Sequence, residues 1–71
     1  MSNVALRVAI IESGLTQRQI AKDCSIAESR FSLIVRRRRM PSDDERAAIA
    51  AALGRAEDDL FPWPYNQHIA S

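Results

Sequence analysis

Cysteine, histidine and glycine are scarce in this chain of 71 residues, which has one cysteine, one histidine and two glycines. A single cysteine excludes an internal disulfide, and one cysteine far in sequence from one histidine gives no spacing typical of a metal site. No apolar run approaches the roughly 18 residues of a membrane span, and no secretory leader pattern is present. We therefore expect a cytoplasmic protein without metal or cofactor, in which Cys24 is a small buried hydrophobe.

The sequence also shows no group of residues at a spacing typical of a catalytic site. His68 has no nucleophile or carboxylate at a spacing that suggests catalysis, so we expect a solvated side chain and no enzymatic activity. The length permits one small domain, which buries only about 60% of its unfolded surface and is marginally stable. An apolar content of 46% suits a compact core of helices.

Charge is unevenly distributed along the chain, although the net charge is only +1. Residues 13–41 contain seven cations and two acids, a net charge of +5, and include the run Arg36–Arg39. Residues 42–71 contain two cations and six acids, a net charge of −4. A basic segment in a nearly neutral protein is the expected footprint of a surface that faces phosphates.

The basic segment contains the pattern of two short helices joined by a tight turn, over residues 17–24 and 28–36. Thr16 can cap the first of these helices, with Gln19 at the capping-box position. The apolar pattern stops between the helices, and Phe31 and Ile34 then share one face of the second helix. The opposite face of that helix is left to meet a groove.

The rest of the chain also predicts helices. Three are expected, over residues 3–13, from a Ser42 cap to Gly54, and over residues 56–61. Gly14 ends the first and Pro62 stops the last, while Glu45 completes a capping box with Ser42. No strand pattern or repeat is present, so the sequence predicts an all-α fold of five helices. The expected organisation is a domain, residues 1–61, and an aromatic C-terminal tail, residues 62–71.

Several short motifs occur together along this helical pattern. They are Gly14-Leu15-Thr16-Gln17, Ile20-Ala21, Pro41-Ser42, Ala52-Leu53-Gly54 and Asp59-Leu60-Phe61. With these motifs, residues 4–61 resemble the phage-repressor family of helix-turn-helix domains, also called Xre-like. The resemblance implies a compact lambda-repressor-like fold and a sequence-specific transcriptional regulator of a phage, prophage or bacterial operon. Helix 28–36 is then expected in the major groove of double-stranded DNA.

Five positions depart from the family pattern. Ser25 and Arg37 stand where the family has glycine. Ala27 stands where the family has a capping serine or threonine, which weakens the start of the helix by about 1 kcal/mol. Ile10 and Val35 stand where many members have an arginine–glutamate ion pair. Because both are apolar, we expect them to contact each other in the core, since a packed apolar pair often replaces a buried ion pair without loss.

The predicted DNA-binding residues come from the two helices of the motif and the basic run that follows. They are Thr16, Gln17, Arg18, Glu28, Ser29, Arg30, Ser32, Leu33, Arg36, Arg37, Arg38 and Arg39. Gln17 can meet a phosphate at a helix start, and Arg36–Arg39 stand where this fold places backbone contacts. Arg30 is expected to clamp a phosphate. The alternatives are a solvent-exposed helix start at Gln17 and an arginine run that is only a solvated loop.

The start of the second motif helix carries the expected base contacts. Ser29 can bond to several bases, and Glu28 can accept a hydrogen bond from cytosine N4. Glu28 has a second interpretation, because a carboxylate at a helix N-terminus offsets a poor cap and also repels phosphates. Ser32 and Leu33 can reach base edges or a thymine methyl group.

The first helix has two apolar stripes, where a surface helix needs only one. The expected inward stripe is Leu6, Ala9 and Ile10. The second stripe is Val4, Val8 and Ile11. Three of the four aromatics stand at the end of the last predicted helix or just after it and offer a cover: Phe61, Trp63 and Tyr65. Either these aromatics pack over their own domain, or the two sets form the interface of a homodimer. The alternative to DNA binding is therefore a protein-interaction module that uses this helix and the tail.

Overall fold

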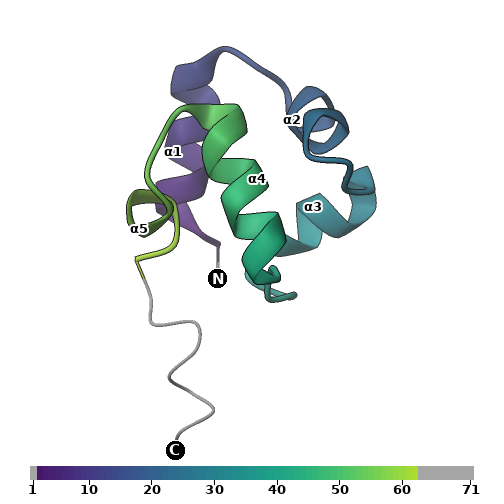
Figure 1. Ribbon diagram of the computed structural model, residues 1–71. Helices are drawn as coiled ribbons and strands as arrows, with labels where there is room; N and C mark the ends of the chain where they lie inside the picture. The colour runs from purple at the N-terminus through teal and green to yellow at the C-terminus, as the bar shows by residue number, and fades with distance from the viewer. Residues whose placement is uncertain (1, 63–71) are drawn as a thin grey trace, which may run out of the picture.

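Five α-helices account for most of residues 2–62, which are the residues described in this computed structural model (Figure 1). They are α1 (Val4–Ser13), α2 (Gln17–Asp23), α3 (Glu28–Val35), α4 (Asp43–Leu53) and α5 (Glu57–Leu60). No strand occurs among the described residues. The predicted all-α fold of five helices is confirmed, and each predicted boundary lies within one residue of the observed one.

Side-chain caps fix where α2 and α4 begin. The Thr16 hydroxyl accepts a hydrogen bond from the Gln19 N–H at 3.1 Å, and the Gln19 side chain accepts one from the Thr16 N–H at 2.9 Å. Ser42 and Glu45 form the same reciprocal pair at 3.1 and 2.8 Å. Both predicted capping boxes are therefore present. Two glycines in the left-handed conformation follow α1 and α4: Gly14 and Gly54.

The helix α4 lies between two pairs of helices, with α2 and α3 on one side and α1 and α5 on the other (Figure 1). The buried apolar side chains come from all five helices, the turn between α2 and α3, and the residue that follows α5. They are Leu6, Ala9, Ile10, Ile20, Ala21, Ile26, Phe31, Ile34, Val35, Ile49, Ala50, Leu60 and Phe61. The inward stripe predicted for α1 is confirmed, and Ile10 and Val35 both lie in this core.

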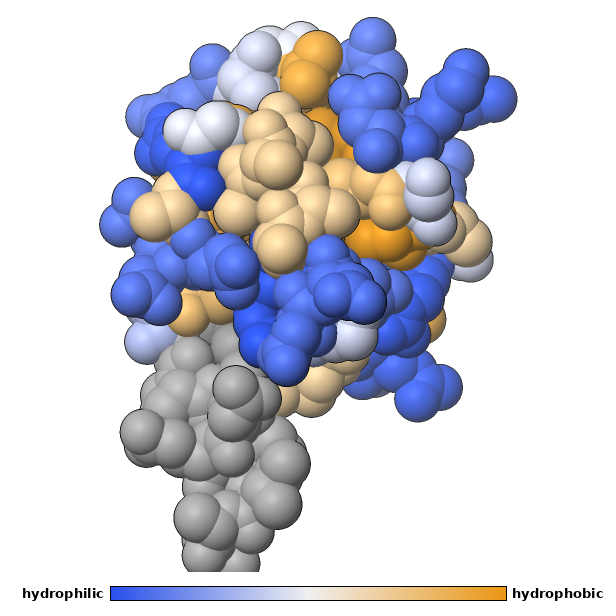
Figure 2. Space-filling model, in the orientation of Figure 1, coloured by the Kyte–Doolittle hydropathy of each residue, from blue (hydrophilic) through white to orange (hydrophobic). Residues whose placement is uncertain are grey.

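The outer face of α4 is built from small side chains. Ala47 and Ala51 are exposed, and Figure 2 shows an apolar area over α4 that continues into more hydrophobic residues on the right of the view. Their short side chains make these two positions suitable for control substitutions.

The position of Phe61 decides between the two alternatives for this residue. Its side chain is buried in the core of its own domain, which was the first of the two alternatives for the aromatics. It is therefore not available to a partner subunit. Trp63 and Tyr65 lie outside the described residues.

Asn3 is a fully buried polar residue that connects three helices. Its side chain caps α1 by accepting from the Leu6 N–H at 2.9 Å and donates to the Leu60 carbonyl at 2.8 Å. Its backbone N–H donates to the Val35 carbonyl at 2.8 Å. The start of α1 is thereby held against the ends of α3 and α5. Because the buried amide forms hydrogen bonds, its burial does not destabilise the fold.

Candidate nucleic-acid interface

The connection between α2 and α3 is a tight turn with a left-handed residue. Ser25 has a φ of 58°, in the region that glycine adopts most readily. Ile26 follows it into the core, and its N–H donates to the Ala21 carbonyl at 2.9 Å. Ala27 precedes α3, and no side-chain cap bond is formed there, as the sequence predicts.

Replacing Ser25 with glycine should stabilise the domain by up to about 1 kcal/mol, because the left-handed conformation costs an L-residue roughly 1–2 kcal/mol. Part of this gain is offset, since glycine loses more backbone entropy on folding. Thermal unfolding should show a midpoint higher by about 4 °C or more for each kcal/mol gained. The β-branched variant Ser25→Val should melt below the parent. A valine variant that melts at or above the glycine variant would contradict the strained turn.

The helix α3 buries one face and presents the other to solvent. Phe31, Ile34 and Val35 are buried in the core, as the sequence pattern predicted for the first two. The predicted base-contacting residues lie on the other side: Glu28 and Ser29 are exposed, and Ser32 and Leu33 are half-buried. The N-terminal part of α3 is therefore the most accessible part of this face.

The segment Arg36–Arg39, here named the arginine turn, folds back over the C-terminal end of α3. The N–H groups of Arg37 and Arg38 donate to the carbonyls of Ile34 and Leu33 at 3.0 and 2.9 Å. Arg37 has a φ of 62°, which explains why glycine suits this position in the resembled family. All four arginines are exposed. Cations at the C-terminal end of a helix are favoured by its dipole. The helix dipole therefore favours the arginine turn at this position.

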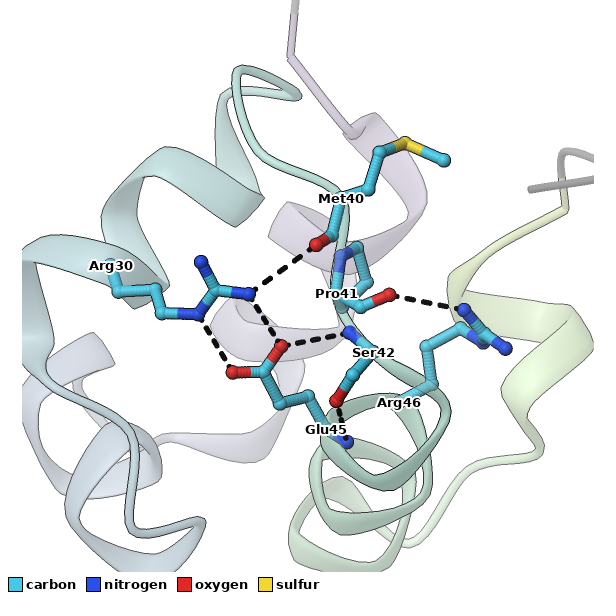
Figure 3. Close-up of polar contacts among 6 residues, drawn as sticks. All are labelled: Arg30, Met40, Pro41, Ser42, Glu45 and Arg46. Atoms are coloured by element: carbon cyan, nitrogen blue, oxygen red, sulfur yellow. Dashed lines mark hydrogen bonds and ion pairs between the residues drawn. The ribbon is translucent and has the colours of Figure 1, made fainter. Parts of the chain in front are cut away.

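The phosphate contact expected of Arg30 stays a prediction. Arg30 forms an ion pair within its own domain while 41% of its side chain remains exposed. Its Nε and Nη2 atoms bond to the two carboxylate oxygens of Glu45 at 2.7 and 2.8 Å (Figure 3). The Arg30 guanidinium, helped by the bond from the Ser42 N–H, lowers the pKa of the Glu45 carboxyl to about 2. The same hydrogen bonds raise the pKa of Arg30. The pair links α3 to the start of α4.

The residues predicted to contact DNA at the start of α2 lie on the helix that packs against α3. Thr16 uses its hydroxyl as the helix cap, and Arg18 is exposed. Gln17 is half-buried and borders a shallow hollow with Arg7 and Ile11 of α1. The exposed cation Arg18 lies beside this helix start, and the phosphate contact expected there stays a prediction.

Cys24 ends α2 and packs against the core while remaining half-buried. Burial, together with the nearby Asp23 carboxylate, raises the pKa of its thiol. The thiol is thus protonated and poorly nucleophilic at neutral pH. Within residues 2–62, His, Cys, Asp and Glu side chains nowhere gather in the groups of three that hold a metal ion.

None of the five helices has the length and apolar character needed to cross a membrane. Comparisons with protein-family models, with curated proteins and with solved structures found no match. The geometry of α2, α3 and the arginine turn is therefore the basis for any functional assignment.

Proposed function

We propose that this protein is a sequence-specific DNA-binding transcriptional regulator of the phage-repressor type. In this proposal α2, the turn and α3 form a helix-turn-helix within a lambda-repressor-like fold. One observation carries it: the exposed face of α3 leads directly into the four exposed arginines of the arginine turn. An exposed helix face of this kind fits the major groove of double-stranded DNA, and cations at its end fit the adjacent phosphates.

We assign a role in DNA binding to each part of the helix-turn-helix that reaches the surface. Ser29 and Glu28 read base edges at the start of α3, with Ser32 and Leu33 further along the helix. The arginine turn and the start of α2 hold the DNA backbone, which fixes the position of α3. Glu28 keeps its second interpretation as a charge that offsets the missing cap of α3. Arg30 is left out of the direct contacts because its guanidinium is bonded to Glu45.

A gel shift with genomic DNA fragments at two salt concentrations tests the proposed function. Contacts to phosphates weaken steeply as salt rises, whereas base contacts favour particular sequences. We expect binding to many fragments at the lower concentration and retention of one or a few at the higher one. If no fragment binds at the lower concentration, the DNA-binding proposal fails and the protein-interaction module becomes the better assignment.

Changing Ser29 to alanine, or Glu28 to glutamine, should alter the preferred bases while sparing stability and non-specific binding. Both side chains are exposed, and each good base contact discriminates by about 1–3 kcal/mol. Selection of bound sequences from random DNA should give a changed motif for each variant. If Glu28 serves only the helix start, Glu28→Gln will keep the parental motif. Parental motifs from both variants would show that α3 is misplaced.

The second apolar stripe of α1 favours a second copy of this chain as an additional partner. Val4, Val8 and Ile11 are 66%, 43% and 76% exposed, so this predicted stripe has no cover among the described residues. One recognition helix reads only a few base pairs, and regulators of this class bind DNA half-sites as symmetric pairs. We propose that two copies pair through α1 on half-sites about one helical turn apart.

The double substitution Val8→Gln and Ile11→Gln should weaken binding to a two-half-site operator by about tenfold or more, because the two copies then bind their half-sites independently. Affinity for a single half-site should stay at the parental value. Ala47→Gln with Ala51→Gln, on the exposed face of α4, is the matched control. Equal losses on both DNA molecules would show that the α1 stripe does not join two copies.

A further inference from the structure

The Arg30 side chain connects α3 to the residue that follows the arginine turn and to the start of α4. It lies in α3, and its Nη2 atom donates to the Met40 carbonyl at 3.4 Å as well as to Glu45 (Figure 3). Met40 directly follows the arginine turn. The Arg30 side chain therefore spans from the helix that precedes the turn to the residue just after it.

Glu45 holds the other side of this arrangement. Its Oε1 atom accepts from Arg30 and from the Ser42 N–H at 2.8 Å, while the Ser42 hydroxyl accepts from the Glu45 N–H. The next residue of α4, Arg46, donates to the carbonyl of the buried Pro41 at 3.1 Å. The residues that follow the arginine turn are thus fixed to the first turn of α4.

The near end of the arginine turn is fixed by the backbone of α3, and the far end by this side-chain network. We propose that the Arg30–Glu45 pair is a positioning device that holds the arginine turn in register with the exposed face of α3 for contact with the DNA backbone. This inference rests on the proposed function. The planar guanidinium suits the task because its two-pronged bond to a carboxylate fixes direction as well as distance. A turn that is already ordered loses less conformational freedom on binding.

The direction in which one substitution changes DNA affinity separates this positioning role from a purely electrostatic role. Glu45 is a negative charge near a surface that meets phosphates, so its removal should strengthen DNA binding if charge alone matters. If the pair positions the arginine turn, the same removal should weaken DNA binding. Glu45→Gln is suited to the test because glutamine also serves in a capping box, so α4 keeps its start.

The experiment compares Glu45→Gln with Asp44→Asn, which removes one negative charge from the neighbouring exposed position of α4. Affinity for a short double-stranded DNA is measured by fluorescence anisotropy over a salt series, at a temperature where circular dichroism shows both variants folded. We expect Glu45→Gln to bind about tenfold more weakly with a shallower salt dependence, and Asp44→Asn to bind at least as tightly as the parent. Arg30→Lys keeps the charge but loses the two-pronged bond to the carboxylate, so its DNA affinity should resemble that of Glu45→Gln.

A second measurement needs no DNA. Trypsin cleaves after arginine, so its rate of cleavage within residues 36–39 reports how well the arginine turn is held. We expect this rate to rise severalfold in Glu45→Gln and to stay at the parental value in Asp44→Asn. If Glu45→Gln matches Asp44→Asn in both measurements, the positioning role is overturned. If the parent fails to bind DNA, the proposed function is overturned instead, and the trypsin rates still decide whether the pair holds the turn.

Discussion

Replacing Ile10 with arginine should destabilise the domain by about 3–5 kcal/mol, which is the usual result of leaving a buried charge without a partner. The Ile10 side chain is 7% exposed and belongs to a core of apolar residues. A domain of this size has a free energy of unfolding of roughly 4–10 kcal/mol, so the variant should be largely unfolded or melt far below the parent. Thermal unfolding followed by circular dichroism measures the change.

The neighbouring position gives a matched control for this substitution. Ile11 is on the same helix but exposed, so Ile11→Arg should change stability by no more than about 0.5 kcal/mol. The double variant Ile10→Arg with Val35→Glu would place the family's ion pair at the two positions. If they are in contact, as the sequence predicts, the double variant should recover part of the stability lost by Ile10→Arg. A melt unchanged by Ile10→Arg alone would refute the packing of this core.

Replacing Arg36 and Arg38 together with alanine should weaken binding to all DNA sequences by a similar factor, about tenfold to a hundredfold at low salt. Both side chains are exposed on the arginine turn, where they are proposed to meet phosphates. The slope of log affinity against log salt should become shallower by about 0.9 for each phosphate that the variant no longer neutralises. Fluorescence anisotropy with a specific and a non-specific duplex measures both quantities.

A charge-matched variant separates local contact from net charge. Arg55→Glu lowers the net charge by the same two units, but at the link between α4 and α5, where Arg55 pairs with Glu12. It should leave most of the affinity and the salt slope intact. A loss confined to one duplex with an unchanged slope would mean that Arg36 and Arg38 read bases and that their assignment to the DNA backbone is wrong.

The helices could be predicted because their signals are local. The capping boxes begin at Thr16 and Ser42, and each is complete within four residues. The buried face of α3 follows from the spacing of Phe31 and Ile34, which needs no knowledge of the partner helices. The second stripe of α1 was also predicted, because three apolar residues remained after the inward face was assigned.

The polar contacts between helices could not be predicted, because they join residues that are far apart in the sequence and leave no local signal. Arg30 and Glu45 are 15 residues apart, and their bond depends on how α3 packs beside α4. Glu45 already had a local explanation as part of a capping box, and Arg30 stood in a basic segment, so neither signalled the other. The buried amide of Asn3 also depends on partners distant in sequence, since it bonds to Leu60, 57 residues further along the chain.

Selection of bound duplexes from a pool of random DNA is the most direct test of the central claim that α3 reads sequence. We expect enrichment of a defined motif, retained at a salt concentration that releases the unselected pool. This motif should change when Ser29 or another exposed residue of α3 is replaced. Binding that stays indifferent to sequence through repeated selection, or no binding at all, would contradict this claim.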